Sequence, residues 1–280
     1  MKPPIAEFGQ PDDRVIAGER ASPPWSPLKF FLLVFALSLP FWLMGAATGL
    51  QLMPGLSVSA LVAFCPAIAA LTLVYKKRGR AGVLTLLKRS FDFKRIKEKR
   101  WYVPMLFLMP AVSVAVYALM RLMDMPLPAP EFQLWPALLM LIAFFLSALG
   151  EELGWSGYAL APLQDRWGAL RASLMLGAVG VVWHLIPLLL SHRSPTWIAW
   201  WCLYGLTTRV LIVWLYNNTG KSVFAAALFH AMLNLAWMLF PVNGSHFDIR
   251  LSGIMMALVA ITVVAVWGPK TLTRAQHANV

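Results

Sequence analysis

The chain has 280 residues, of which 59% are hydrophobic and only 13% are charged, and its mean hydropathy is +0.67. This composition excludes an ordinary soluble protein and indicates an integral membrane protein that crosses the bilayer several times. The net charge of +12 would suggest a nucleic-acid partner in a soluble protein. Here, 11 of the 24 Lys and Arg residues lie in the single segment 76–100, which is typical of a loop at a membrane face. We therefore expect the lipid bilayer, and no nucleic acid, as a partner.

Apolar runs of about 18 to 20 residues are long enough to cross the hydrocarbon layer as helices. The first run follows a polar tail of residues 1–28, too far from the start for a cleavable signal, so we expect this span to be retained. The sequence has no internal repeat. It thus predicts an all-α membrane bundle of about eight transmembrane helices, with one domain over 29–269 and a C-terminal tail over 270–280. The predicted spans are about 30–50, 57–75, 101–123, 135–158, 172–191, 196–216, 221–240 and 251–268.

The basic segment 76–100 follows the second predicted span. Because short cytoplasmic loops are enriched in Lys and Arg, it places this loop and both chain termini in the cytoplasm. A multi-pass protein of the cytoplasmic membrane is expected. The segment would anchor the topology and contact anionic head groups; a role in docking a substrate is the alternative.

Four ionisable side chains lie deep inside predicted spans. Glu151 and Glu152 stand side by side in GEELGWSG, directly after an apolar run, and His184 and His230 lie in the fifth and seventh spans. Charge inside a membrane is costly and usually marks a functional site. At about 1.5 Å per residue, Glu151, His184 and His230 each lie roughly 13 to 18 Å from the cytoplasmic ends of their helices. Asn234 shares a helix face with His230 because it follows four residues later.

These groups suit hydrolysis of a bond inside the bilayer. A buried carboxylate can take a proton from water, one histidine can orient that water, and a second histidine with an amide can stabilise an oxyanion. Alternatively, Glu151, His184 and His230 could hold one divalent metal, with zinc as the expected ion, and leave a position open for water. Chemistry alone leaves a proton- or ion-coupled transporter open as well. Cys65 and Cys202 lie in separate spans without metal-like spacing, which indicates packing residues.

Three stretches resemble a known family: EELGWSGYALAPLQ, VVWHLIP and WLYNNTGKSVFAAALFHAMLN. They look like the EExxxR, FxxxH and HxxxN motifs of the CPBP family, the CAAX-protease and bacteriocin-processing (Abi) intramembrane endopeptidases. The similarity covers a motif core of residues 140–240. The resemblance implies that Glu151 activates the water together with His184, and that His230 and Asn234 stabilise the oxyanion. It also implies Glu152 as a fifth site residue.

Two motif positions differ from the family pattern. Ser156 stands in place of the motif arginine, which at four residues after Glu152 would pair with that carboxylate along the helix. Gly180 stands in place of the aromatic residue four positions before His184. In the sixth span, Arg209 is a candidate for the missing guanidinium, provided that this helix lies beside the fourth. The alternative is that Arg209 extends to the membrane surface.

The sequence therefore predicts a glutamate-type intramembrane endopeptidase, with or without one divalent metal, that acts on a membrane-associated peptide or protein. The alternative functions are a non-catalytic family member, such as an immunity factor or scaffold, and a proton-coupled transporter that uses Glu and His.

Overall fold

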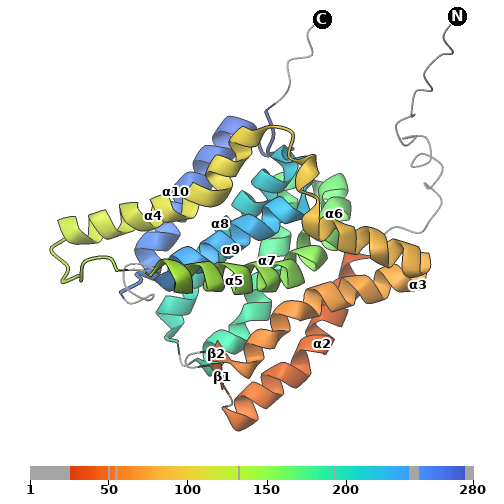
Figure 1. Cartoon of the computed structure of the whole chain (residues 1–280), viewed down its shortest axis with the longest axis horizontal. Helices are drawn as coiled ribbons and strands as arrows, with labels where there is room; N and C mark the ends of the chain where they lie inside the picture. Colours follow the sequence, from red (N-terminus) through yellow and green to blue (C-terminus); the bar gives the residue numbers. More distant parts are fainter. Residues whose placement is uncertain are drawn as a thin grey trace, which may run out of the picture.

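The computed structural model describes residues 26–49, 51–53, 56–131, 133–191, 193–239 and 246–274. Over these residues the chain forms a bundle of helices (Figure 1), so the predicted all-α, polytopic class is confirmed. Most of the predicted tail 1–28, and the last part of the predicted tail 270–280, lie outside the described residues. The α-helices are α2 (Pro27–Thr48), α3 (Cys65–Lys88), α4 (Tyr102–Leu122), α5 (Leu134–Gly154), α6 (Leu160–Trp167), α7 (Ala169–Leu190), α8 (Pro195–Asn218), α9 (Val223–Leu239) and α10 (Ile249–Trp267).

The eight predicted spans each correspond to a helical segment. Seven segments of the described chain are long and apolar enough to cross a membrane, while α9 is apolar but has only 17 residues. Its length is roughly 26 Å at the usual helical rise. The fourth span is longer than predicted, because α5 continues through a π-helical segment, η5 (Trp155–Ala159), directly into α6.

Capping residues fix several helix boundaries. Ser26 accepts a hydrogen bond from the backbone N–H of Lys29, and Ser194 does the same for Trp197, each with a proline next in the chain. Such helix starts are common. The serine hydroxyl accepts from a backbone N–H that has no partner within the helix, and proline has no N–H that would need one. α10 begins after Asp248, whose carboxylate accepts from the first helical N–H groups. The polar residues between spans therefore determine where the helices begin.

The basic segment 76–100 differs from the predicted loop. α3 continues through it as far as Lys88, with a kink at Gly79 (φ 58°), a left-handed conformation that favours glycine. Three short 3-10 turns follow: η2 (Arg89–Phe91), η3 (Phe93–Arg95) and η4 (Lys99–Trp101). A second unpredicted feature is a small hairpin between α2 and the 3-10 segment η1 (Val58–Phe64). It pairs β1 (Gln51–Met53) antiparallel with β2 (Leu56–Ser57).

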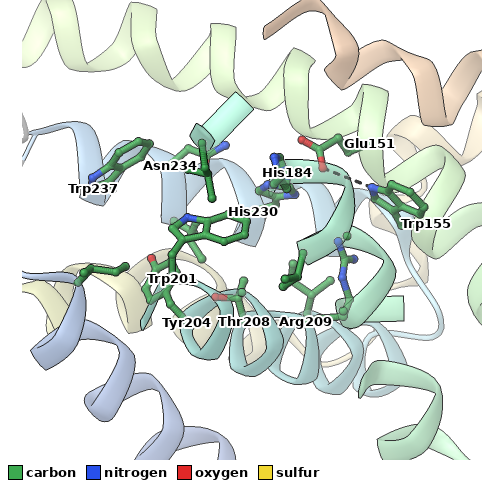
Figure 2. Close-up of a pocket in the computed structure, with 18 of the residues that line it drawn as sticks. Glu151, Trp155, His184, Trp201, Tyr204, Thr208, Arg209, His230, Asn234 and Trp237 are labelled. Atoms are coloured by element: carbon green, nitrogen blue, oxygen red, sulfur yellow. Dashed lines mark hydrogen bonds between the residues drawn. The ribbon is translucent and has the colours of Figure 1, made fainter. Parts of the chain in front are cut away.

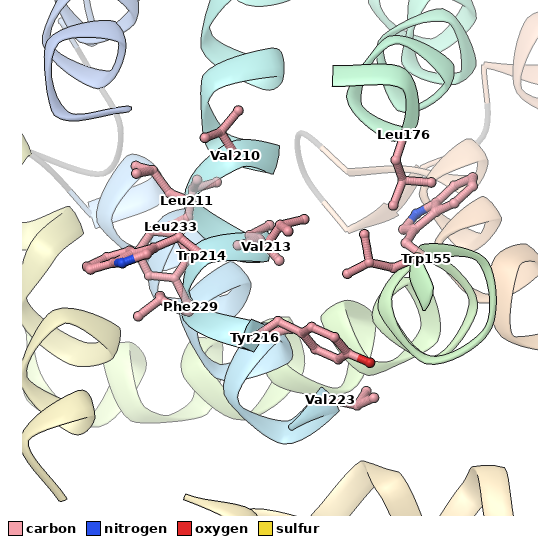
Figure 3. Close-up of a cluster of buried hydrophobic side chains, with 14 of the residues drawn as sticks. Trp155, Leu176, Val210, Leu211, Val213, Trp214, Tyr216, Val223, Phe229 and Leu233 are labelled. Atoms are coloured by element: carbon pink, nitrogen blue, oxygen red, sulfur yellow. The ribbon is translucent and has the colours of Figure 1, made fainter. Parts of the chain in front are cut away.

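α8 and α9 run through the middle of the bundle (Figure 1). α8 packs against α7 and α10, while α9 packs against α5 and α4. Figure 3 shows buried side chains of α8 and α9, among them Leu211, Trp214 and Phe229, in one apolar cluster that continues to Trp155. α9 and its neighbour α5 therefore carry the motif residues inside the bundle.

Candidate functional site

The motif GEELG puts two glycines on one face of α5. A Cβ atom on Gly150 would lie 2.7 Å from the carbonyl oxygen of Ala63, and one on Gly154 would lie 2.5 Å from that of Pro66. Only glycine permits this approach of α5 to η1 and α3, as in other small-xxx-small contacts between membrane helices. The spacing of Gly150 and Gly154 is a signal for close helix packing that the sequence analysis did not use.

Glu152 is fully buried, with 0% of its surface exposed, and several polar groups surround it. Nη1 of Arg209 donates to both carboxylate oxygens, at 3.0 and 2.9 Å. Nδ1 of His230 lies 3.0 Å from Oε1, and the Ser156 hydroxyl donates to Oε2. The predicted pairing of Arg209 with Glu152 is therefore confirmed, and the 8% exposure of Arg209 excludes the alternative of extension to the membrane surface.

Glu151 is also buried, but its side chain points in a different direction from that of Glu152. Successive helical residues point about 100° apart, and Glu151 faces a cavity of about 250 Å³ that His184, His230 and Asn234 also line. Nε1 of Trp155 donates to its carboxylate at 3.3 Å. Figure 2 shows Glu151 and both imidazoles directed into this space.

The structure thus divides the five predicted site residues into two groups. Glu151, His184, His230 and Asn234 line one cavity, and three different helices, α5, α7 and α9, contribute them. Glu152 lies behind the cavity and holds Arg209 and His230. Among these residues, His230 alone belongs to both groups, so it links the ion pair to the cavity.

His184 is held between two indole rings. The ring centroids of Trp183 and Trp201 lie 4.6 and 5.2 Å from that of His184, at interplanar angles of 65° and 71°. Gly180 leaves open space on the same helix, since a Cβ there would meet no atom within 4 Å. An aromatic ring from α8 therefore contacts His184 although the motif position on α7 carries no side chain.

Two residues of the basic segment connect the helices that carry the site. Asp92 accepts from the Ser222 hydroxyl at 2.7 Å and from the backbone N–H groups of Val223 and Phe224, so it caps the start of α9. Arg89 donates to the carbonyl oxygen of Gly157 in η5 and to that of Lys221 before α9. The sequence analysis missed this function because it treated 76–100 as a topology signal.

The remaining cavity wall is apolar and aromatic. α8 and α9 contribute Trp201, Tyr204 and Trp237 (Figure 2), and Phe247 also lines the cavity. In the described part of the chain, no three His, Cys, Asp or Glu side chains form a group that could hold a metal ion. Cys65 is a buried core residue and Cys202 is partly buried, and both are free thiols. The arrangement offers a carboxylate, two imidazoles and a carboxamide beside a space for an apolar group.

Removal of Arg209 should destabilise the fold, because it leaves the Glu152 carboxylate buried with fewer partners. We expect Arg209→Ala to lower the free energy of unfolding by about 3 to 5 kcal/mol. The Arg209→Met/Glu152→Met double variant should recover a large part of this loss, since it removes both charges. The measurement is denaturant unfolding in mixed micelles, followed by tryptophan fluorescence.

Arg250→Ala is the matched control. Arg250 pairs with Asp248 at 3.1 Å, but its side chain is 61% exposed, and its loss should leave stability close to that of the wild type. Equal effects of Arg209→Ala and Arg250→Ala would contradict a structural role for the buried pair.

Comparison with known proteins finds similarity to CAAX prenyl proteases. A family model described as type II CAAX prenyl endopeptidase, Rce1-like, matches residues 133–236, which include all five site residues. CAAX prenyl protease 2 of Methanococcus maripaludis is 28% identical over 245 aligned residues, which cover 75% of this chain and 83% of that relative. The chain is thus similar to CAAX prenyl proteases over the part that carries all five site residues.

Proposed function

We propose that this protein is an intramembrane endopeptidase that hydrolyses a peptide bond of a membrane-associated substrate with water activated by Glu151. One observation carries the proposal: Glu151, His184, His230 and Asn234 come from three helices and line a single cavity inside the bundle. Ionisable groups at membrane depth are expensive, so their convergence on an enclosed space favours a chemical role over a packing role. The similarity to CAAX prenyl proteases supports the same class of reaction.

In the proposed mechanism, Glu151 acts as the general base. Its carboxylate accepts a proton from water as the water oxygen attacks the scissile carbonyl carbon, and the proton later passes to the leaving amine. The indole N–H of Trp155 fixes the orientation of the carboxylate. His184 lies beside the same space, and its contacts with Trp183 and Trp201 restrict the ring, so it can orient the attacking water.

His230 and Asn234 would stabilise the oxyanion that forms on the scissile carbonyl. They are four residues apart on α9 and line the same cavity. Nδ1 of His230 lies 3.0 Å from the Glu152 carboxylate, and in this mechanism that nitrogen carries the proton and donates it there. A proton on Nε2 as well would give the ring a second N–H that can donate to the oxyanion. Glu152 and Arg209 thus act as positioning residues.

A lipidated C-terminal CAAX peptide is the substrate we propose to test first. The matching family is described as a CAAX prenyl endopeptidase, and the Methanococcus maripaludis relative is a CAAX prenyl protease. The aromatic part of the cavity, with Trp201, Tyr204 and Trp237, adjoins the polar groups and would accept an apolar segment of such a substrate. We further propose a cytoplasmic orientation for the basic face, since 11 of 24 Lys and Arg lie in 76–100.

We expect Glu151→Gln, His184→Ala and His230→Ala each to reduce cleavage of a farnesylated CAAX peptide in proteoliposomes by at least about 100-fold. Each variant removes a group that acts on the reacting atoms. Cleavage is measured by mass spectrometry of the released tripeptide, and folding by tryptophan fluorescence.

Glu131→Gln is the matched carboxylate control, because Glu131 is exposed in the loop before α5. It should cleave at the wild-type rate. Wild-type activity of Glu151→Gln would remove the proposed mechanism, and full activity of either histidine variant would remove that residue from it.

We also propose that catalysis needs no metal, in place of the alternative of one zinc ion on Glu151, His184 and His230. The supporting observation is that His230 uses Nδ1 for Glu152 and shares a face with Asn234, which suits an oxyanion donor. Activity should therefore persist after prolonged treatment with a strong chelator, and elemental analysis should find much less than about one zinc per chain. Loss of activity on chelation, with recovery on addition of zinc, would contradict the metal-free mechanism.

The Arg209 contact predicts a specific rescue. Arg209→Ala should lower kcat on the order of 100-fold, because a displaced Glu152 no longer fixes His230. Adding Ser156→Arg should restore much of the activity, since position 156 already contacts Glu152. The comparison is made with steady-state kinetics on folded protein. If the double variant is no better than Arg209→Ala, the guanidinium is not the group that matters.

A further inference from the structure

A second cavity, of about 700 Å³, lies beside the end of the basic segment 76–100, since Glu98 and Arg100 line it. Its walls come from η4, the start of α4, the ends of α8 and α10, and residues 273 and 274. None of the proposed catalytic residues lines it. The cavity is therefore separate from the proposed active site.

Three tryptophans form one wall of this cavity. The rings of Trp101 and Trp267 each pack edge to face against Trp214, with centroids 5.4 and 5.2 Å from it. Nε1 of Trp214 is a buried donor that has no hydrogen-bond partner among the described residues. Indole rings gather where apolar chains meet polar head groups, because they are apolar with one polar edge.

The charged side chains that line the cavity carry a net charge of +1. They are Arg100, Arg274 and Glu98, and Arg100 pairs with Glu98. The guanidinium of Arg274 lies 5.1 Å from the ring centroid of Trp267 and is exposed. Four further basic residues, Lys94, Arg95, Lys97 and Lys99, add positive charge next to the lining residues Glu98 and Arg100.

Hydrogen bonds from α8 hold the segment that leads to Arg274. Nδ2 of Asn217 donates to the carbonyl oxygen of Thr271 at 2.8 Å, and Nδ2 of Asn218 donates to that of Leu272 at 2.7 Å. Leu272 is fully buried and adopts φ 52°, which is unfavourable for leucine and persists only where surrounding contacts enforce it. Arg274 therefore follows a turn fixed against the bundle.

We propose that this cavity binds the head group of an anionic phospholipid. Arg274 and Arg100 would contact the phosphate, and the three indoles would contact the glycerol region and the first part of the acyl chains. A cavity of this size accommodates a head group, and its position beside the predicted membrane surface favours a lipid over a soluble ligand. The bound lipid would tie the end of α10 to the start of α4.

Native mass spectrometry of the full-length protein in neutral detergent tests this proposal. The protein is given equal amounts of phosphatidylglycerol and phosphatidylcholine. We expect retention of one phosphatidylglycerol in preference to phosphatidylcholine, and a fall in this preference of about fivefold for Arg274→Gln. Arg100→Gln should lower it in the same direction.

Arg166→Gln is the matched control, because Arg166 also lies over an indole, 4.9 Å from the ring centroid of Trp167, but does not line the cavity. It should keep the wild-type preference. A thermal shift produced by inorganic phosphate alone, equal to that from phosphatidylglycerol, would identify a site for a soluble anion and overturn the proposal. Unchanged lipid preference in Arg274→Gln would also overturn it.

Discussion

The buried carboxylate of Glu152 is the constraint on which the rest of the site depends. An unpaired charge at this depth would be unfavourable by several kcal/mol. Arg209 and His230 satisfy it from two other helices, at 2.9 to 3.0 Å. The three residues therefore fix α5, α8 and α9 relative to one another, and the position of His230 in the cavity follows from this contact. The stability of the bundle and the geometry of the site depend on the same hydrogen bonds.

Close backbone packing makes this network possible. Gly150 and Gly154 let α5 approach η1 and α3 more closely than any larger residue would allow. Directly after Gly154 the chain changes to π-helical geometry at Trp155–Ala159, a feature that often occurs at functional sites. The carbonyl oxygen of Gly157 in this segment accepts from Arg89, which also donates to the carbonyl oxygen of Lys221, two residues before α9. Arg89 thus connects the segment that follows α5, the helix with both glutamates, to the segment that precedes α9, the helix with His230.

The sequence predicts the spans and most of the site because both depend on local signals. Long apolar runs identify the helices, and Glu151, His184 and His230 stand out as ionisable groups inside them. Features that depend on contacts between distant segments were not predictable in this way. One example is the extension of α3 beyond Gly79. Another is the cap that Asp92 forms on α9, because the capped residue Phe224 lies far away in the chain. The pairing of Arg209 with Glu152 was predictable, because the energetic cost of two unpaired buried charges requires a partner for each.

α8 provides both replacements for the motif residues that this chain lacks. Arg209 supplies a guanidinium although position 156 is serine, and Trp201 supplies a ring against His184 although position 180 is glycine. Residues 201, 204, 205, 208, 209 and 212 all line the cavity, and this spacing of three and four defines one face of a single helix. In the family pattern these groups come from the helices that carry the glutamates and the first histidine. Here they come from a third helix, α8. Any shift of α8 would move Arg209, the partner of Glu152, together with Trp201, which contacts His184. The geometry of the cavity therefore depends on how α8 packs.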